Sequence, residues 1–116
     1  MRVIVTGGAG FLGQRVAREF LARGADEVVL VDVAPPPPAL ADDPRITVVT
    51  GDLESALAGI EPADVVIHLA AVVSSAAEQD FDLGMRVNLD GTRAVLERCR
   101  VGDRARRGVR QLGRRL

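Results

Sequence analysis

The sequence predicts an α/β fold in which helices cover both faces of a truncated, doubly wound parallel sheet. Four short, β-branched runs are expected to be strands, at residues 2–6, 27–32, 46–50 and 64–69. Their nearly continuous apolar character is typical of strands that are buried on both faces. Helical or crossover segments alternate with these runs, which favours right-handed parallel connections. A chain of 116 residues with 47% hydrophobic content has room for one compact core.

Helical patterns occur in two longer segments, one between the first two strands and one after the fourth strand. The first helix is expected over residues 11–23, where apolar residues recur at helical spacing and Gly24 occupies the position of a C-terminal cap. A short helix is expected near 53–59. A long helix is expected from Asp80 to Cys99, with one apolar face formed by Phe81, Met85, Leu89, Thr92, Leu96 and Cys99.

The crossover between the second and third strands is predicted to be a loop. It contains the four consecutive prolines Pro35–Pro38 and, further along, Pro44. Consecutive prolines favour an extended polyproline conformation because the ring fixes φ and removes a hydrogen-bond donor.

Residues 6–13, with the sequence TGGAGFLG, are a candidate phosphate-binding turn. Gly7, Gly10 and Gly13 directly follow the first strand and open the first helix. A tight turn, a close approach of the backbone to a diphosphate and close packing of helix on strand each require a glycine. The first helical residues, Phe11 and Leu12, then present free N–H groups to the anion. An ordinary tight turn is the alternative interpretation.

Asp32 ends the second strand, 19 residues after Gly13. A carboxylate at this point accepts the hydroxyl groups of an adenosine ribose, and its charge repels a 2′-phosphate. No basic residue occurs at positions 33–41, so the sequence predicts NAD as the cofactor in preference to NADP. The alternative for Asp32 is a solvated carboxylate at a strand end.

These residues resemble the opening of the extended short-chain dehydrogenase/reductases, the NAD-dependent epimerase/dehydratase family. The resemblance continues through GDL at 51–53, HLAA at 68–71 and NLDGT at 88–92. It implies a Rossmann-like sheet with strand order 3-2-1-4. The segment from 68 to 92 is similar to the branch of the family that oxidises four-carbon sugar acids, so the implied substrate is a sugar or sugar acid.

The resemblance also implies further cofactor-binding residues. Asp52 and Leu53 are expected to hold the adenine, and Ala70 and Ala71 to run along the cofactor. Asn88 is expected to shape the active site indirectly, through a hydrogen bond from its helix to the sheet. His68, within an apolar run, is interpreted as a hydrogen-bonded core residue.

The chain contains no Tyr and no Lys, whereas the family transfers protons with a Tyr-x-x-x-Lys pair. We therefore predict no catalytic side chain and no metal site, and we interpret the chain as the NAD-binding N-terminal portion of an oxidoreductase. Two alternatives stay open: a stand-alone nucleotide-binding module, and an interaction module whose basic tail contacts an acidic partner.

Charge divides the chain into a predicted domain, 1–99, and an Arg-rich tail, 100–116. The domain has 15 acidic residues against 8 arginines, a net charge of −7, whereas the tail has 7 arginines against one Asp, a net charge of +6. The tail is interpreted as disordered or as the product of a frame change, since a shifted reading of 108–115 permits Val-Phe-Ala-Ser-Ser-Val-Ala-Val. The nucleotide sequence of the gene tests that interpretation.

Three expectations concern partners and compartment. The tail lacks interleaved aromatic residues, so nucleic acid is not a predicted partner. The fourth strand is expected to be an uncovered edge, which favours self-association. The single Cys99, the lack of a signal-like N-terminus and the lack of an apolar run of roughly 20 residues predict a cytoplasmic protein without membrane contact.

Overall fold

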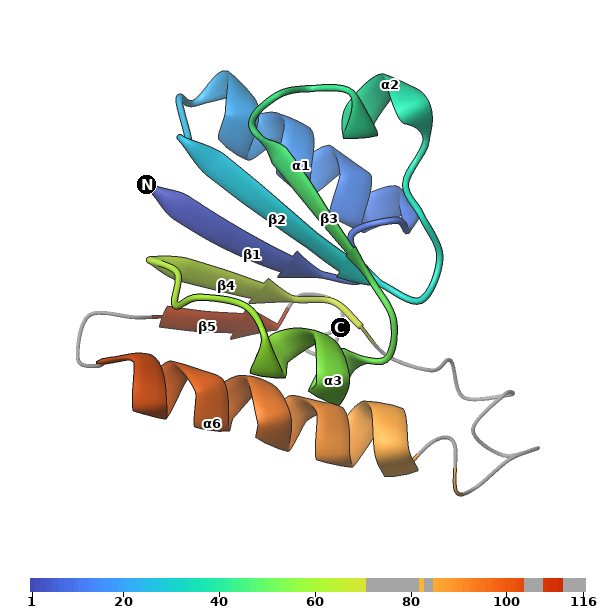
Figure 1. Ribbon diagram of the computed structural model, residues 1–116, viewed down its shortest axis with the longest axis vertical. Coiled ribbons are helices and arrows are strands. Elements are labelled where there is room, and N and C mark those ends of the chain that lie inside the picture. Colours follow the sequence, from blue (N-terminus) through green and yellow to red (C-terminus); the bar gives the residue numbers. More distant parts are fainter. Residues whose placement is uncertain (71–81, 83–84, 104–107, 112–116) are drawn as a thin grey trace.

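The computed structural model describes residues 1–70, 82, 85–103 and 108–111, and its centre is a parallel sheet (Figure 1). The sheet has five strands in the order β3-β2-β1-β4-β5. The predicted α/β class and the order 3-2-1-4 of the first four strands are confirmed. The strand bounds are β1 Arg2–Thr6, β2 Glu27–Asp32, β3 Ile46–Thr50, β4 Val65–His68 and β5 Gly108–Gln111.

Helices cover both faces of the sheet (Figure 1). Helices α1 and α2 lie on one face, and α3 and α6 lie on the other. Their bounds, with those of the π-helical segment η1, are α1 Phe11–Ala22, α2 Pro38–Ala41, α3 Leu53–Ala58, η1 Met85–Asp90 and α6 Gly91–Asp103. Among the described residues, no helix combines the length and the apolar character that crossing a membrane requires.

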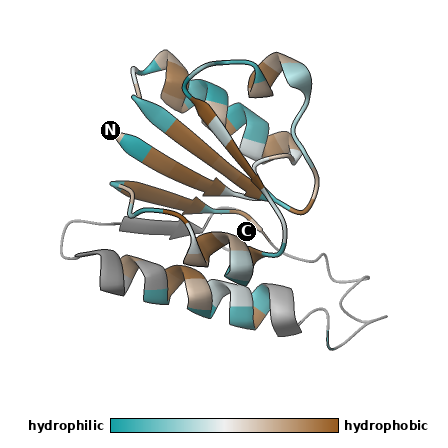
Figure 2. Cartoon of the chain, viewed as in Figure 1, coloured by the Kyte–Doolittle hydropathy of each residue, from teal (hydrophilic) through white to brown (hydrophobic). Residues whose placement is uncertain are grey.

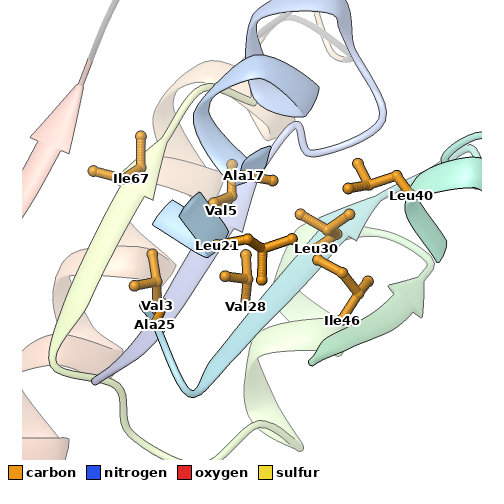
Figure 3. Packing of buried hydrophobic residues seen from close by; sticks show 10 residues of the cluster. All are labelled: Val3, Val5, Ala17, Leu21, Ala25, Val28, Leu30, Leu40, Ile46 and Ile67. Atoms are coloured by element: carbon orange, nitrogen blue, oxygen red, sulfur yellow. The ribbon is translucent and has the colours of Figure 1, made fainter. Parts of the chain in front are cut away.

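Each face of the sheet carries its own apolar core. Strands β1 and β2 are hydrophobic along most of their length and carry their hydrophilic residues at their ends (Figure 2). Because successive strand side chains point to opposite faces, Val3 and Val5 pack toward α1 while Ile4 packs toward α3 and α6. The ten buried residues of the α1 face are Val3, Val5, Ala17, Leu21, Ala25, Val28, Leu30, Leu40, Ile46 and Ile67 (Figure 3).

The prolines predicted that the whole crossover from β2 to β3 is a loop. The structure shows instead that the crossover contains the four-residue helix α2. Pro38 is the first residue of α2, where a missing N–H costs no hydrogen bond and a fixed φ suits the helix. Leu40, only 2% exposed, anchors α2 in the core of the α1 face. The proline run therefore starts a helical turn and does not prevent one.

The apolar face predicted for the long helix was wrong in part. Thr92 contacts the buried His68 and Cys99 packs against the core of the α3 face, as predicted, but Leu89 and Leu96 do not face the core. Leu89 and Leu96 are 46% and 51% exposed, whereas Val95 is 1% exposed and belongs to the core. The chain here forms a π-helical segment, η1, followed by α6. A π-helix has wider turns than an α-helix, so it rotates the residues that follow it relative to an unbroken α-helical pattern.

The predicted open edge at β4 was also wrong. Strand β5 pairs with β4 in parallel, with Val65 opposite Gly108 and His68 opposite Gln111. Helix α6 runs to Asp103, beyond the predicted domain boundary at residue 99. Part of the tail thus belongs to the sheet, and β5 takes the place of β4 as its outer strand. Self-association stays a prediction. A frame change and the cytoplasmic location stay predictions.

Arg45, just before β3, ties the end of α1 to the β2–β3 crossover. Its guanidinium binds the Asp43 carboxylate through two nitrogens, at 3.1 and 3.0 Å, and donates to the carbonyl of Leu21 at 3.0 Å. The side-chain hydrogen bond from Arg45, together with one from its backbone N–H, holds the pKa of Asp43 below its ordinary value of 3.8.

This ion pair predicts a pH-dependent contribution to stability. A carboxylate whose pKa is lowered by folding stabilises the fold above its ordinary pKa, and the contribution is lost as pH falls through the folded pKa. We expect Asp43→Asn to lower the melting temperature at pH 7, and the difference from wild type to vanish as the pH falls below 3.8. Thermal melts in a pH series measure this, and a difference that persists unchanged in acid contradicts it.

Candidate functional site

The candidate site lies where the carboxyl ends of β1, β2 and β4 meet, and its centre is the turn from β1 to α1. The N–H groups of Gly7 and Gly8 both donate to the carbonyl of Val31, at 2.7 and 3.3 Å, so the turn is fastened to β2. Gly7 has φ +73°, and a β carbon there would lie 3.0 Å from the N atom of Ala70. This position therefore requires glycine both for its backbone angle and for the close approach of β4.

Gly13 and Gly8 allow α1 to pack closely on the turn and on the sheet. A β carbon on Gly13 would lie 2.2 Å from the carbonyl oxygen of Gly7, and one on Gly8 would lie 2.8 Å from the β carbon of Leu30. Gly10 differs, since a β carbon there would meet only the Gly7 oxygen, at 3.4 Å. Sequence reasoning assigned a role to Gly13 but missed Gly8, whose adjacency to Gly7 was the available signal.

The N-terminus of α1 is open toward solvent beside this turn. Gly10 caps it in an extended conformation, with no side-chain hydrogen bond and no acidic residue in the first turn. The first N–H groups of an α-helix have no acceptor within the helix. Phe11 and Leu12, which carry such groups, are 78% and 45% exposed. The Arg15 guanidinium carbon lies 5.5 Å from the centre of the Phe11 ring, which adds positive charge near this helix end.

Asp32 points at the glycine turn. Its Oδ2 accepts a hydrogen bond from the N–H of Ala9 at 2.9 Å, and its Oδ1 accepts from Val33 at 2.7 Å and Ala34 at 3.4 Å. A carboxylate has about four lone-pair directions, so Oδ2 retains acceptor capacity beside the turn. The interpretation of Asp32 as merely a solvated strand end is therefore wrong.

Gln14 completes the fixing of the turn. Its side-chain amide donates to the carbonyl of Ala9 at 2.7 Å, while Asp32 accepts from the N–H of the same residue. The backbone N–H and the carbonyl of Ala9 thus both form hydrogen bonds with side chains. Sequence reasoning missed Gln14, because a polar residue in the first turns of a helix carries no distinctive pattern.

Asp52 and Leu53 lie at the end of β3, next to the end of β2. The N–H of Gly51 donates to the main-chain carbonyl of Asp32 at 3.0 Å, which joins the two strand ends. Asp52 caps α3, and its carboxylate accepts from the N–H of Ser55 at 3.2 Å. Leu53 is half-buried against the core of the α3 face. Both residues therefore border the site from the β3 side.

The end of β4 forms the other border. Ala70 lies next to the glycine turn, and its N–H donates to Oγ1 of Thr6 at 3.2 Å. His68 is 3% exposed and makes hydrogen bonds to Thr6 and Thr92, which confirms its interpretation as a hydrogen-bonded core residue. Asn88 lies in η1, and its carbonyl accepts from the Thr92 hydroxyl at 2.7 Å. Ala71 lies outside the described residues.

In chemical terms the site can bind an anion and a hydroxylated group side by side. The open N-terminus of α1 attracts negative charge, and the Asp32 carboxylate accepts hydrogen bonds from hydroxyl groups. Within the described part of the chain, no group of three or more potential metal ligands is found.

The sequence of this chain matches a known family and known proteins. The model of the 3-beta hydroxysteroid dehydrogenase/isomerase family matches residues 4–109. D-erythronate dehydrogenase of Cupriavidus necator is 49% identical over 114 residues, which cover 86% of this chain and 35% of that enzyme. The enzyme of the same name from Haemophilus influenzae is 45% identical over 110 residues, which cover 89% of this chain and 35% of that enzyme.

A solved structure agrees with the fold. The Bordetella bronchiseptica enzyme WbmF, crystallised in complex with NAD+, matches with a TM-score of 0.81 and 25% identity, over 95% of this chain and 35% of that one. The chain spans 35% of the length of the two D-erythronate dehydrogenases. The predicted resemblance to the epimerase/dehydratase enzymes is confirmed, and the chain belongs to the 3-beta hydroxysteroid dehydrogenase/isomerase family.

Proposed function

We propose that this chain binds the adenosine diphosphate half of NAD as part of a sugar- or sugar-acid-converting dehydrogenase or epimerase. The observation that carries the proposal is the hydrogen bond of 2.9 Å from the Ala9 N–H to Asp32. It places the carboxylate that would accept ribose hydroxyls directly beside the glycine turn. A dinucleotide presents its diphosphate and its ribose to a protein at this short separation.

The residues present fit the cofactor. The uncapped first turn of α1, with the N–H groups of Phe11 and Leu12, would hold the diphosphate. Asp32 would accept the hydroxyls of the adenosine ribose, and its charge disfavours the 2′-phosphate of NADP. Asp52 and Leu53, at the end of β3, would border the adenine. When bound, NAD supplies a hydride acceptor for oxidation of a hydroxyl-bearing carbon.

The substrate proposal rests on the relatives. D-erythronate dehydrogenases from two bacteria are 45–49% identical to this chain. We propose a four-carbon sugar acid as the substrate of the protein to which this segment corresponds. Within this chain, binding without turnover is the second candidate function, because the sequence contains neither the Tyr nor the Lys of the proton-transfer pair.

Isothermal calorimetry of this chain with NAD, NADP and ADP-ribose tests the proposal. We expect NAD and ADP-ribose to bind with similar affinity, because both carry the adenosine diphosphate that would contact α1 and Asp32. We expect NADP to bind at least about tenfold more weakly, since its 2′-phosphate meets the Asp32 carboxylate. If neither NAD nor ADP-ribose binds, the proposed function is wrong; if NADP binds as well as NAD, the role given to Asp32 is wrong.

A further inference from the structure

A buried chain of hydrogen bonds connects β1, β4 and α6 directly beneath the glycine turn. Thr6, the last residue of β1, has no exposed surface, and its β-sheet partner His68 is 3% exposed. Oγ1 of Thr6 lies 2.6 Å from Nδ1 of His68, and Nε2 of His68 lies 3.1 Å from Oγ1 of Thr92. Such a buried polar chain is costly to form unless its members satisfy one another.

The contacts of Thr6 determine the direction of every hydrogen bond in this chain. Its Oγ1 accepts from the N–H of Leu69 at 3.0 Å and from the N–H of Ala70 at 3.2 Å. A hydroxyl has two acceptor lone pairs and one proton, so with both lone pairs engaged the proton of Thr6 is donated to His68.

The tautomer of His68 follows from this direction. Nδ1 accepts the Thr6 proton and so carries no hydrogen, which leaves the ring hydrogen of the neutral imidazole on Nε2. Nε2–H donates to Oγ1 of Thr92, whose own hydroxyl donates to the carbonyl of Asn88 at 2.7 Å. The chain of donors therefore runs from Thr6 through His68 and Thr92 to the backbone of η1.

The position of these bonds links them to the candidate cofactor site. Thr6 immediately precedes Gly7, and the two amides that it holds, those of Leu69 and Ala70, belong to the chain as it leaves β4. These same residues lie closest to Gly7, where an added β carbon would be 3.0 Å from the N atom of Ala70 and from the carbonyl carbon of Leu69. Any shift of the β4 exit would therefore press on the glycine turn or leave it unsupported.

We infer that Thr6, whose hydroxyl donates to His68 in its Nε2–H tautomer, is a positioning residue that fixes the β4 exit beneath the glycine turn and thereby sets the geometry for binding the diphosphate. The inference rests on the proposed function. His68 itself does not contact the diphosphate, since it lies buried within the sheet. Its imidazole accepts from the Thr6 hydroxyl, and the same hydroxyl accepts from both exit amides.

Three variants separate this positioning role from a general role in stability. Thr6→Val keeps the side-chain shape but removes the hydroxyl, and Thr6→Ser keeps the hydroxyl. Thr92→Val removes the bond to His68 on the side away from the exit amides. Calorimetry with ADP-ribose is expected to show a loss of about tenfold or more in Thr6→Val, and changes of less than about threefold in Thr6→Ser and Thr92→Val.

Two measurements on the ligand-free protein test the inference independently of binding. Nitrogen-15 NMR of the imidazole is expected to show hydrogen on Nε2 and none on Nδ1 in the wild type and in Thr6→Ser. Hydrogen exchange at the Ala70 amide is expected to accelerate at least about tenfold in Thr6→Val, and much less in Thr92→Val. The Leu69 amide also donates to the main-chain carbonyl of Thr6 at 3.1 Å, so a smaller change is expected there.

Several results of these experiments would overturn the inference. The inference is overturned if the wild type carries a hydrogen on Nδ1, or if the Ala70 amide exchanges equally fast in Thr6→Val and Thr92→Val. It is also overturned if Thr6→Val leaves the affinity for ADP-ribose unchanged. Failure of Thr6→Ser to restore the affinity lost in Thr6→Val overturns it as well. If the wild type does not bind ADP-ribose, the proposed function is wrong, and so is the role of these residues in binding. The NMR and exchange results then still decide whether the hydrogen bonds of Thr6 fix the β4 exit.

Discussion

Gly13→Ala is expected to unfold the chain or to leave it without a cooperative thermal transition. The added β carbon would lie 2.2 Å from the carbonyl oxygen of Gly7 and 2.8 Å from the α carbon of Gly8. Both neighbours are backbone atoms of a turn that two hydrogen bonds fasten to β2, so neither can move aside cheaply. We expect a loss of at least about 3 kcal/mol in the free energy of unfolding, measured by urea denaturation.

Gly10→Ala is the matched control for this prediction. Gly10 has φ −73°, and its added β carbon would contact only the Gly7 oxygen, at 3.4 Å. We expect a change of less than about 1 kcal/mol in stability, because the position is exposed and its backbone angle suits alanine. A Gly13→Ala protein that unfolds at the same urea concentration as Gly10→Ala would contradict the packing of α1 on the turn.

Asp32→Ala is expected to weaken binding of NAD and of ADP-ribose by about a hundredfold or more. The substitution removes the acceptor for the ribose hydroxyls and releases the N–H of Ala9 from its anchor. Hydrogen bonds to a charged group contribute about 1.5–3 kcal/mol each, and two such losses give this magnitude. Calorimetry with both ligands measures it.

Two further variants show which property of Asp32 matters. Asp32→Asn keeps an acceptor oxygen but removes the charge, so we expect it to narrow the preference for NAD over NADP. Asp42→Ala removes an exposed carboxylate at the C-terminal end of α2, and we expect it to leave both affinities unchanged. Equal losses in Asp32→Ala and Asp42→Ala would show that only the net charge of the domain matters.

The sheet and the centre of the site were predictable because each depends on short-range pattern. Four β-branched runs identified β1 to β4, since strands covered on both faces have no reason to alternate. The glycine spacing and Asp32 identified the turn, because a tight backbone approach leaves few residue choices. Asp32 was also expected near the turn, since parallel strands end at the same edge of a sheet.

Other features depend on contacts between distant residues and could not be read from the pattern. A π-helical segment breaks the regular spacing that predicted Leu96 as buried, and Val95 takes that place. The hydrogen bond from Gln14 to the carbonyl of Ala9 can be predicted only when it is known how the turn folds back on α1. Thr6 and His68 are 62 residues apart in sequence and meet only through the register of β1 with β4.

The two-faced core has a consequence for the order in which the molecule assembles. The α1 face draws nine of its ten core residues from the first 46 residues, and only Ile67 comes later. The opposite face is incomplete until Val95 arrives from α6. A contact between distant residues forms only after the entropy cost of closing the long loop between them has been met. Segments whose contacts are close in sequence therefore form sooner. We expect the β1–α1–β2–β3 unit to collapse early, even on the ribosome, and α6 to dock in the slower step.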